Sequence, residues 1–270
     1  MPVSELNGQK IWQRRDRPTA IKHWLMWLVG TLIVLWCWQI ISDATTWAFV
    51  RDSPEQAMQL IARMFPPNVA YAPTLVRPLW DTLNIATLGS IMGVAIALPI
   101  SFLAATNTTP HPIVRSIALL MIVTSRSINS LIWALLLVAI LGPGLLAGVL
   151  AIGLRSIGFV GKLFFEAIEE IDREPVEAVT ATGASELQVL SYGIVPQVLP
   201  TFVGVSVFRW DINIRESTVL GLVGAGGIGV QLSAAVNGLQ WGRVCTIFIV
   251  IFLMVLFSEW VSAKARKEII

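Results

Sequence analysis

One polar stretch, residues 166–196, decides how the chain is interpreted, and it reads EAIEEIDREPVEAVTATGASELQVLSYGIVP. Pro175 suits the first turn of a short helix, and Glu177 suits the positive N-terminal end of that helix. Gly183 ends the helix, and a second helix begins at Ser185 and stops before the final proline. The stretch therefore predicts two short helices joined by a glycine, forming a compact projection.

Apolar runs lie on both sides of this polar stretch. The chain has 270 residues, of which 55% are hydrophobic and 13% charged, with a mean hydropathy of +0.73. These values exclude an ordinary soluble domain and indicate an all-α integral membrane protein. Because a span needs about 20 apolar residues, the sequence predicts six transmembrane helices: Trp24 to Ile41, Leu79 to Ala105, Ile113 to Leu141, Leu145 to Ile168, Gln197 to Val223 and Trp241 to Ala263.

The placement of Lys and Arg predicts the orientation of these spans. Six spans put both termini on one side, and basic residues favour the cytoplasmic side. We therefore expect residues 1–23, the polar stretch and the tail 264–270 in the cytoplasm. We expect the first span, 24–41, to be an uncleaved anchor. The basic residues that favour this orientation are Arg14, Arg15, Arg17, Lys22, His111, Arg115, Lys162, Arg173, Lys264, Arg266 and Lys267.

The remaining boundaries follow from this orientation. Residues 42–78 form a long extracytoplasmic connection, and residues 79–263 form a core of five spans that includes the loop 169–196. Within the connection, Ser53 as N-cap and Pro54 at the first position predict a short helix that Pro66 and Pro67 stop.

The polar stretch contains a spaced motif: Glu177-Ala178, then Gly183, then Pro196 thirteen residues later. It resembles the Glu-Ala-Ala loop of ABC importer permeases, with Val179 in place of the second alanine. In that family the loop docks on an ATPase subunit, so the resemblance implies that residues 175–190 contact the motor. A generic amphipathic loop is the alternative.

A second stretch, from Arg215 to Gly229, is similar to phosphonate importer permeases and more loosely to methionine importer permeases. The similarity implies the type I importer fold, a methionine-importer-like core with one added N-terminal helix, in a bacterial cytoplasmic membrane. It also implies a homodimer, two ATPase subunits and an extracytoplasmic substrate-binding protein. The implied cargo is phosphonate or a related oxyanion: phosphite, hypophosphite or phosphate.

The same stretch carries a glycine cluster that formally matches a dinucleotide fingerprint. It lacks the preceding strand and the acidic residue that such a site requires. We expect these glycines instead at the outer mouth of the pathway, where the backbone turns tightly or approaches a neighbouring chain. The cluster consists of Gly224, Gly226, Gly227 and Gly229.

Ionisable residues in the fifth span are candidates for function, because charge at membrane depth is costly. Asp211 and Arg215 are four residues apart and predict a structural ion pair. Arg209 and Glu216 share the roughly opposite face but lie about 10 Å apart along the axis. Arg209 is therefore expected to lack a helical partner and, with Asn213 beside it, to meet a travelling anion. The alternative is that Glu216 is paired across helices.

The third span adds a guanidinium and polar side chains suited to transient hydrogen bonds with oxyanion oxygens. Interhelical packing, with Arg126 paired to a carboxylate of the fifth span, is the alternative. These residues are Ser125, Arg126, Ser127 and Asn129, and the fourth span holds a similar pair, Arg155 and Ser156.

The sequence offers no catalytic or metal-binding constellation and predicts a non-catalytic subunit without cofactors or nucleic-acid partners, in contact with membrane lipid. ATP hydrolysis is then expected on another chain. The competing hypothesis is a proton-coupled secondary transporter with Asp211 and Glu216 as relay carboxylates. That hypothesis accounts for neither the polar stretch nor its spacing.

Overall fold

The computed structural model describes residues 3–6, 9–12 and 17–269, and the chain divides into two compact units, residues 1–62 and 63–270. The first unit contains a short antiparallel hairpin, β1 (Val3–Leu6) and β2 (Gln9–Trp12), followed by the long helix α1 (Arg17–Ala44).

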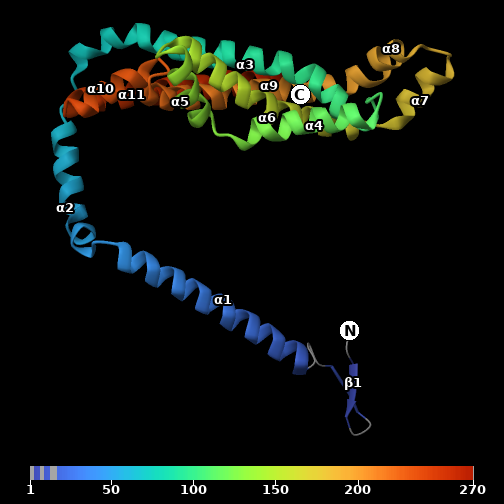
Figure 1. Cartoon of the computed structure of the whole chain (residues 1–270), viewed down its shortest axis with the longest axis horizontal. Helices are drawn as coiled ribbons and strands as arrows, with labels where there is room; N and C mark the ends of the chain where they lie inside the picture. The colour runs from blue at the N-terminus through green and yellow to red at the C-terminus, as the bar shows by residue number, and fades with distance from the viewer. Residues whose placement is uncertain (1–2, 7–8, 13–16, 270) are drawn as a thin grey trace. The chain divides into compact units, whose positions relative to one another are not determined.

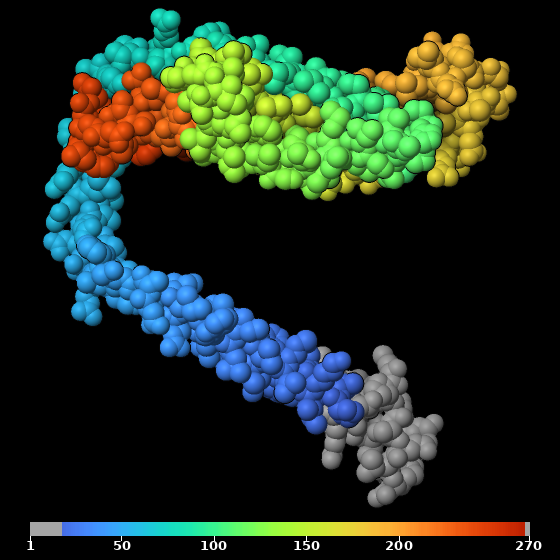
Figure 2. Space-filling model, in the orientation of Figure 1, coloured from blue at the N-terminus to red at the C-terminus, as the bar shows by residue number. Residues whose placement is uncertain are grey.

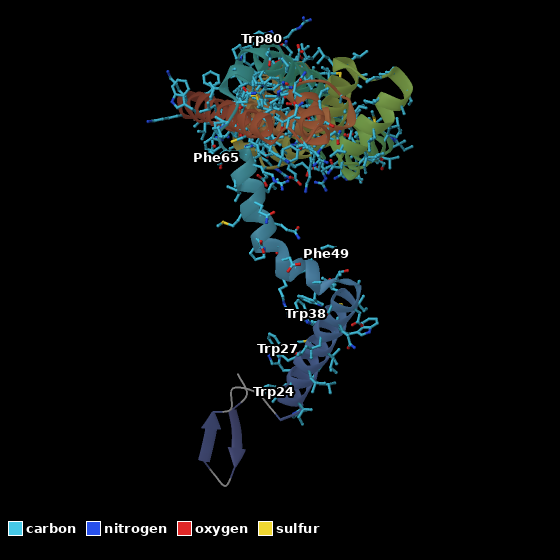
Figure 3. The ribbon with its side chains drawn as sticks, turned by 90° about the vertical axis from the view of Figure 1, so that its left-hand side faces the viewer. Trp24, Trp27, Trp38, Phe49, Phe65 and Trp80 are labelled. Carbon is cyan, nitrogen blue, oxygen red and sulfur yellow. The ribbon has the colours of Figure 1, made fainter. Side chains whose placement is uncertain are left out.

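Helix α1 is apolar on all sides. Trp24, Trp27 and Trp38 project outward from it (Figure 3) and are 76%, 63% and 60% exposed. A helix that is hydrophobic all round and long enough to cross a bilayer is suited to contact lipid rather than water. The first predicted span therefore corresponds to α1.

Helix α2 (Trp47–Met64) begins earlier than predicted. Ser53 is not its N-cap, and Pro54 lies inside the helix. Proline has no N–H, so the carbonyl of Val50 loses its usual helical donor. The hydroxyl of Ser53 donates to that carbonyl at 2.8 Å, which allows the helix to continue through the proline.

The second unit is a helical bundle in which α3 packs along α6, and α9 lies against both (Figure 1). In chain order its elements are the 3₁₀ helix η1 (Val69–Leu75), α3 (Val76–Ala104), α4 (Pro112–Ser127), α5 (Ser130–Leu141), α6 (Leu145–Glu169), α7 (Arg173–Ala181), α8 (Glu186–Val189), the π-helix η2 (Leu190–Ile194), α9 (Val195–Leu220), the 3₁₀ helix η3 (Gly221–Val223), α10 (Ile228–Asn237) and α11 (Trp241–Ile269).

Small residues let the central helices approach closely. A Cβ added to Gly93 of α3 would lie 2.4 Å from the Cβ of Ser156 on α6. A Cβ added to Gly158 of α6 would lie 2.5 Å from the carbonyl oxygen of Ile122 on α4. Such small-residue contacts are typical of helix packing in membranes, where apolar burial alone does not drive association.

The third predicted span is two helices rather than one. Helices α4 and α5 meet at Ile128 and Asn129 with a bend of 88°. The side chain of Asn129 accepts a hydrogen bond from the backbone N–H of Leu131 at 3.0 Å and so caps the start of α5. The described residues contain five helices long and apolar enough to cross a membrane, or six when this bent pair counts as one span. That number agrees with the predicted six.

The short helix α10 was not predicted, and it begins at the glycine cluster. Gly224, Gly226 and Gly227 have φ angles of 88°, 86° and 74°, which glycine adopts without strain. Gly229 serves a close approach instead: a Cβ added there would lie 2.1 Å from the carbonyl oxygen of Thr218. The cluster therefore makes a tight turn and a backbone contact within one chain.

We predict that Gly229→Ala lowers the stability of the purified protein, by about 1 to 3 kcal/mol as for other overpacked sites. The added methyl group must push the end of α9 away from α10, because the atom that it meets belongs to the backbone. The measurement is the apparent melting temperature in detergent. Gly30→Ala is the control, since a Cβ at Gly30 meets nothing within 4 Å. Equal melting temperatures for the two variants would contradict the close approach.

Candidate functional site

A buried polar cluster joins α3, α6 and α9 in the middle of the second unit. Its central member, Arg209, is 1% exposed. The Nε atom of Arg209 donates to the hydroxyl of Ser156 at 3.0 Å, and its two terminal nitrogens contact the two carboxylate oxygens of Glu216 at 3.4 Å each. The ring of Phe159 lies 5.0 Å from the guanidinium. The buried cation thus meets a hydroxyl, a carboxylate and an aromatic ring.

The expectation that Arg209 lacks a helical partner is wrong. Residues seven apart lie on the same face of an α-helix, about two turns from one another. The long side chains of Arg209 and Glu216 reach toward each other and close this separation.

Glu216 has a second cationic neighbour, which lies on the adjacent helix α6. The Nε atom of Arg155 on α6 lies 3.4 Å from its carboxylate, and another nitrogen of Arg155 donates to the carbonyl of Ile128 at 3.3 Å. The pairing of Glu216 across helices is therefore present as well. One carboxylate between two guanidinium groups leaves a local excess of positive charge.

The cluster opens toward one side of the second unit. The side chains of Arg155 and Glu216 are 27% and 21% exposed, whereas that of Arg209 is 2% exposed. An ionised group at membrane depth avoids lipid and faces a partner or a water-filled cavity. This side of the second unit is therefore the one that needs a polar environment.

Asn213 extends the cluster to α3. Its amide nitrogen donates to the hydroxyls of Ser90 at 2.7 Å and Ser156 at 3.1 Å. The side-chain oxygen of Asn213 is buried and has no hydrogen-bond partner in the described part of the chain. Ser156 accepts from both Arg209 and Asn213, so it is the common contact of the cluster. A buried network of this kind fixes the relative positions of the helices that supply it.

The opposite face of α9 holds the predicted contact between Asp211 and Arg215, which is present. Asp211 also accepts a hydrogen bond from the hydroxyl of Ser258 on α11 at 2.8 Å. The carboxylate is thus shared by two helices. Sequence reasoning missed Ser258, whose signal is a hydroxyl that follows a long apolar run in the last span.

Most of the predicted pathway residues near the bend between α4 and α5 use their side chains to hydrogen-bond backbone groups. The hydroxyl of Ser125 accepts from the backbone N–H of Gly158 at 2.8 Å and donates to the carbonyl of Leu154. Ser127 donates to a carbonyl of its own helix, and Asn129 caps α5. Arg126 is exposed and has no carboxylate partner among residues 18–267, so the alternative in which it pairs with Asp211 or Glu216 does not occur.

The first predicted helix of the polar stretch is α7. The prediction that the second helix stops before Pro196 is wrong, because α8 continues through η2 and Pro196 into α9 without a break. Helices α7 and α8 project from the end of the second unit away from α10 (Figures 1 and 2). Asp172 caps α7 by accepting from the backbone N–H of Glu174 at 3.1 Å. Glu177 and Ala178 are exposed on α7, Gly183 follows with a φ of 77°, and Pro196 lies in the first turn of α9.

Exposed apolar side chains accompany the motif on this projection. Leu187 and Tyr192 are 75% and 73% exposed. Tyrosine is enriched at contacts between proteins, and the exposed leucine adds apolar surface to the same projection. Among the described residues, His, Cys, Asp and Glu side chains form no group of three that could hold a metal ion.

Comparison with known proteins agrees with the motif and the helical architecture. Residues 97–263 match the family described as "Binding-protein-dependent transport system inner membrane component". The phosphite transport system permease protein PtxC of Stutzerimonas stutzeri is 42% identical over 242 residues, covering 89% of this chain and 87% of that protein. The phosphate-import permease protein PhnE of Mycolicibacterium smegmatis is 38% identical over 238 residues, covering 88% of this chain and 44% of that longer protein.

Solved structures show the same fold at lower identity. An inward-facing MetNI methionine ABC transporter chain matches with a TM-score of 0.65 and 20% identity, covering 75% of this chain and 99% of that one. A chain of a bacterial alginate importer matches with a TM-score of 0.57 and 17% identity, covering 91% of this chain and 98% of that one. The chain therefore has the type I importer permease fold and belongs to the family of binding-protein-dependent transport system inner membrane components.

Proposed function

We propose that this permease carries a phosphorus oxyanion (phosphonate, phosphite, hypophosphite or phosphate) along a path lined by the cluster of Arg155, Arg209, Asn213 and Glu216. The observation that carries the proposal is the single carboxylate of Glu216 between two guanidinium groups, on a side of the protein that must avoid lipid. Two of the relatives are named for phosphite and phosphate transport, and a third, from Escherichia coli, for phosphonate transport.

The chemistry of the cluster suits such a cargo. A guanidinium donates two parallel hydrogen bonds to the oxygens of a phosphorus oxyanion, as it does to a carboxylate. An entering anion competes with Glu216 for Arg155, while Arg209 keeps its bond to Ser156. Because Glu216 restores the pairing once the anion leaves, binding stays weak enough for passage.

The bend between α4 and α5 contributes less than its sequence suggests. Arg126 is exposed and without a carboxylate partner among residues 18–267, so it is the member of that group that we assign to the path. Ser125, Ser127 and Asn129 use their side chains to hold backbone groups in place. We assign Asp211 and Arg215 a structural role, bracing α9 against α11 through Ser258.

The projection of α7 and α8 is the proposed contact with the ATPase. Its motif residues Glu177, Ala178 and Gly183 are exposed, as are the neighbouring Leu187 and Tyr192. We propose that two ATPase subunits bind two copies of this chain there, and that a binding protein delivers the anion at the α10 end. A second copy would also cover the exposed side of Arg155 and Glu216.

This assignment sets the orientation. The projection, residues 1–23 and the tail 264–270 are cytoplasmic, and residues 42–78 and the turn at Gly224 to Gly229 lie outside. The chain supplies the path, and ATP is hydrolysed by the partner. The alternative of a proton-driven secondary transporter has no support, because the chain belongs to a family of binding-protein-dependent importers.

We predict that Arg155→Gln lowers oxyanion uptake about tenfold or more, since a hydrogen bond to a charged group contributes about 1.5 to 3 kcal/mol. Arg209 remains paired with Glu216 in this variant, so the bundle still assembles. The measurement is uptake of labelled phosphite and phosphate by proteoliposomes that contain the assembled transporter. Arg51→Gln, an exposed arginine of α2, is the control. Wild-type uptake by Arg155→Gln would remove this residue from the path.

We also predict that Gly183→Asp reduces co-purification of the ATPase and abolishes most uptake. The substitution strains a residue with a φ of 77° and adds a negative charge to the exposed projection. Gly142→Asp is the matched control, because Gly142 has a φ of 86°, open space around it and a position at the end of α5.

Both variants strain a glycine of positive φ, but only Gly183→Asp changes the surface of the projection, so comparing them separates the effect of the surface from that of backbone strain. If Gly183→Asp retained the ATPase and full uptake, or if Gly142→Asp lost the ATPase equally, the projection would not be the contact.

A further inference from the structure

The side chain of Gln197 joins the start of α7 to the start of α9. Its oxygen accepts from the backbone N–H of Asp172 at 3.0 Å, and its nitrogen donates to the carbonyl of Asp172 at 3.2 Å. The same nitrogen donates to the carbonyl of Gly193 at 2.7 Å. One amide thus bonds both backbone groups of the residue that caps α7, across 25 positions of sequence.

Local chemistry explains why an amide is needed there. Asp172 lies outside α7 as its N-cap, so its backbone N–H and carbonyl take part in hydrogen bonds with a side chain. Glutamine carries a donor and an acceptor on one planar group and can pair with both. The π-helix that precedes Pro196 departs from the regular α-helical bonding pattern, and the carbonyl of Gly193 in this π-helix accepts from the Gln197 side chain.

A second contact reinforces the connection. Gly193 is buried, and a Cβ added to it would lie 3.3 Å from the Cα of Val176 on α7. Val176 also packs against the apolar cluster that contains Phe164 and Phe202. The backbone of α7 therefore lies directly on the turn that begins α9.

The end of α6 is attached elsewhere. Glu169 accepts from the backbone N–H of Thr106 at 2.8 Å, and the carbonyl of Ile168 accepts from the side chain of Asn107 at 2.5 Å. These bonds hold α6 to the connection between α3 and α4. Only residues 170–172 separate this attachment from α7. Helix α7 is thus joined firmly to α9 and to α6 by a short connection.

We propose that Gln197 is a positioning residue that makes α7 and α9 move together when the ATPase displaces α7. This inference rests on the proposed function, in which α7 contacts the ATPase. Arg209 follows Gln197 by twelve residues on the same helix, about 18 Å along its axis. Displacement of α9 against α6 then separates Glu216 from Arg155, which opens the cluster to the anion.

The test uses the complete transporter in proteoliposomes, with its ATPase and a binding protein saturated with a mixture of phosphate, phosphite and methylphosphonate. Gln197→Leu removes all three hydrogen bonds at similar volume. We expect normal ATPase co-purification and unchanged basal ATP hydrolysis. Stimulation of hydrolysis by the binding protein falls at least fivefold, and so does uptake per ATP hydrolysed. Gln231→Leu is the control, because Gln231 accepts a long-range bond from Tyr71 at 2.9 Å at the other end of the bundle.

Gln197→Glu is the second variant, and it is the one measured if Gln197→Leu fails to assemble. It keeps an acceptor for the N–H of Asp172, loses both donated bonds and places a carboxylate oxygen against two carbonyls, so stimulation is expected to fall below that of the wild type. Wild-type stimulation in the assembled variants overturns the proposal. An equal loss of basal hydrolysis, stimulation and uptake also overturns it, because that pattern indicates a merely structural role. Failure of the wild-type chain to retain its ATPase would refute the docking surface instead.

Discussion

The buried guanidinium of Arg209 is the constraint around which the second unit is built. A cation at membrane depth is costly unless its charge is balanced and its donors are bonded. Glu216, on the same helix as Arg209, balances the charge of the guanidinium. Ser156, on the neighbouring helix α6, accepts a hydrogen bond from its Nε atom. Because these partners come from α6 and α9, the arginine fixes how the two helices face each other.

Close packing makes that arrangement possible. Gly93 and Gly158 bring α3 and α4 against α6 at distances that a side chain would prevent. Serines then fill the remaining space with short hydroxyls that meet Asn213 and Arg209. In a bilayer, where apolar surfaces gain little by leaving lipid, contacts of this kind hold a bundle together. The polar cluster and the small residues are therefore two parts of one packing solution.

The sequence was sufficient for features that depend on composition and local spacing. The number of spans, the pair of Asp211 and Arg215, and the helix that ends before Gly183 follow from composition, periodicity and turn chemistry. The bend in the third span and the continuation of α8 into α9 do not. Features that depend on side-chain reach or tertiary contacts were not accessible. Helical spacing alone separates Arg209 from Glu216, but two extended side chains close the gap. No local pattern indicates that Gln197 bonds Asp172.

The bend between α4 and α5 bears on how the chain enters the membrane. Its halves have 16 and 12 residues, lengths of about 24 and 18 Å, so neither crosses a hydrocarbon core of about 30 Å alone. The break exposes the carbonyl of Ile128, which Arg155 satisfies from the following helix. Neither half crosses the core alone, and the break between them is bonded from α6, so α4 and α5 are expected to cross the membrane as one bent unit in contact with α6.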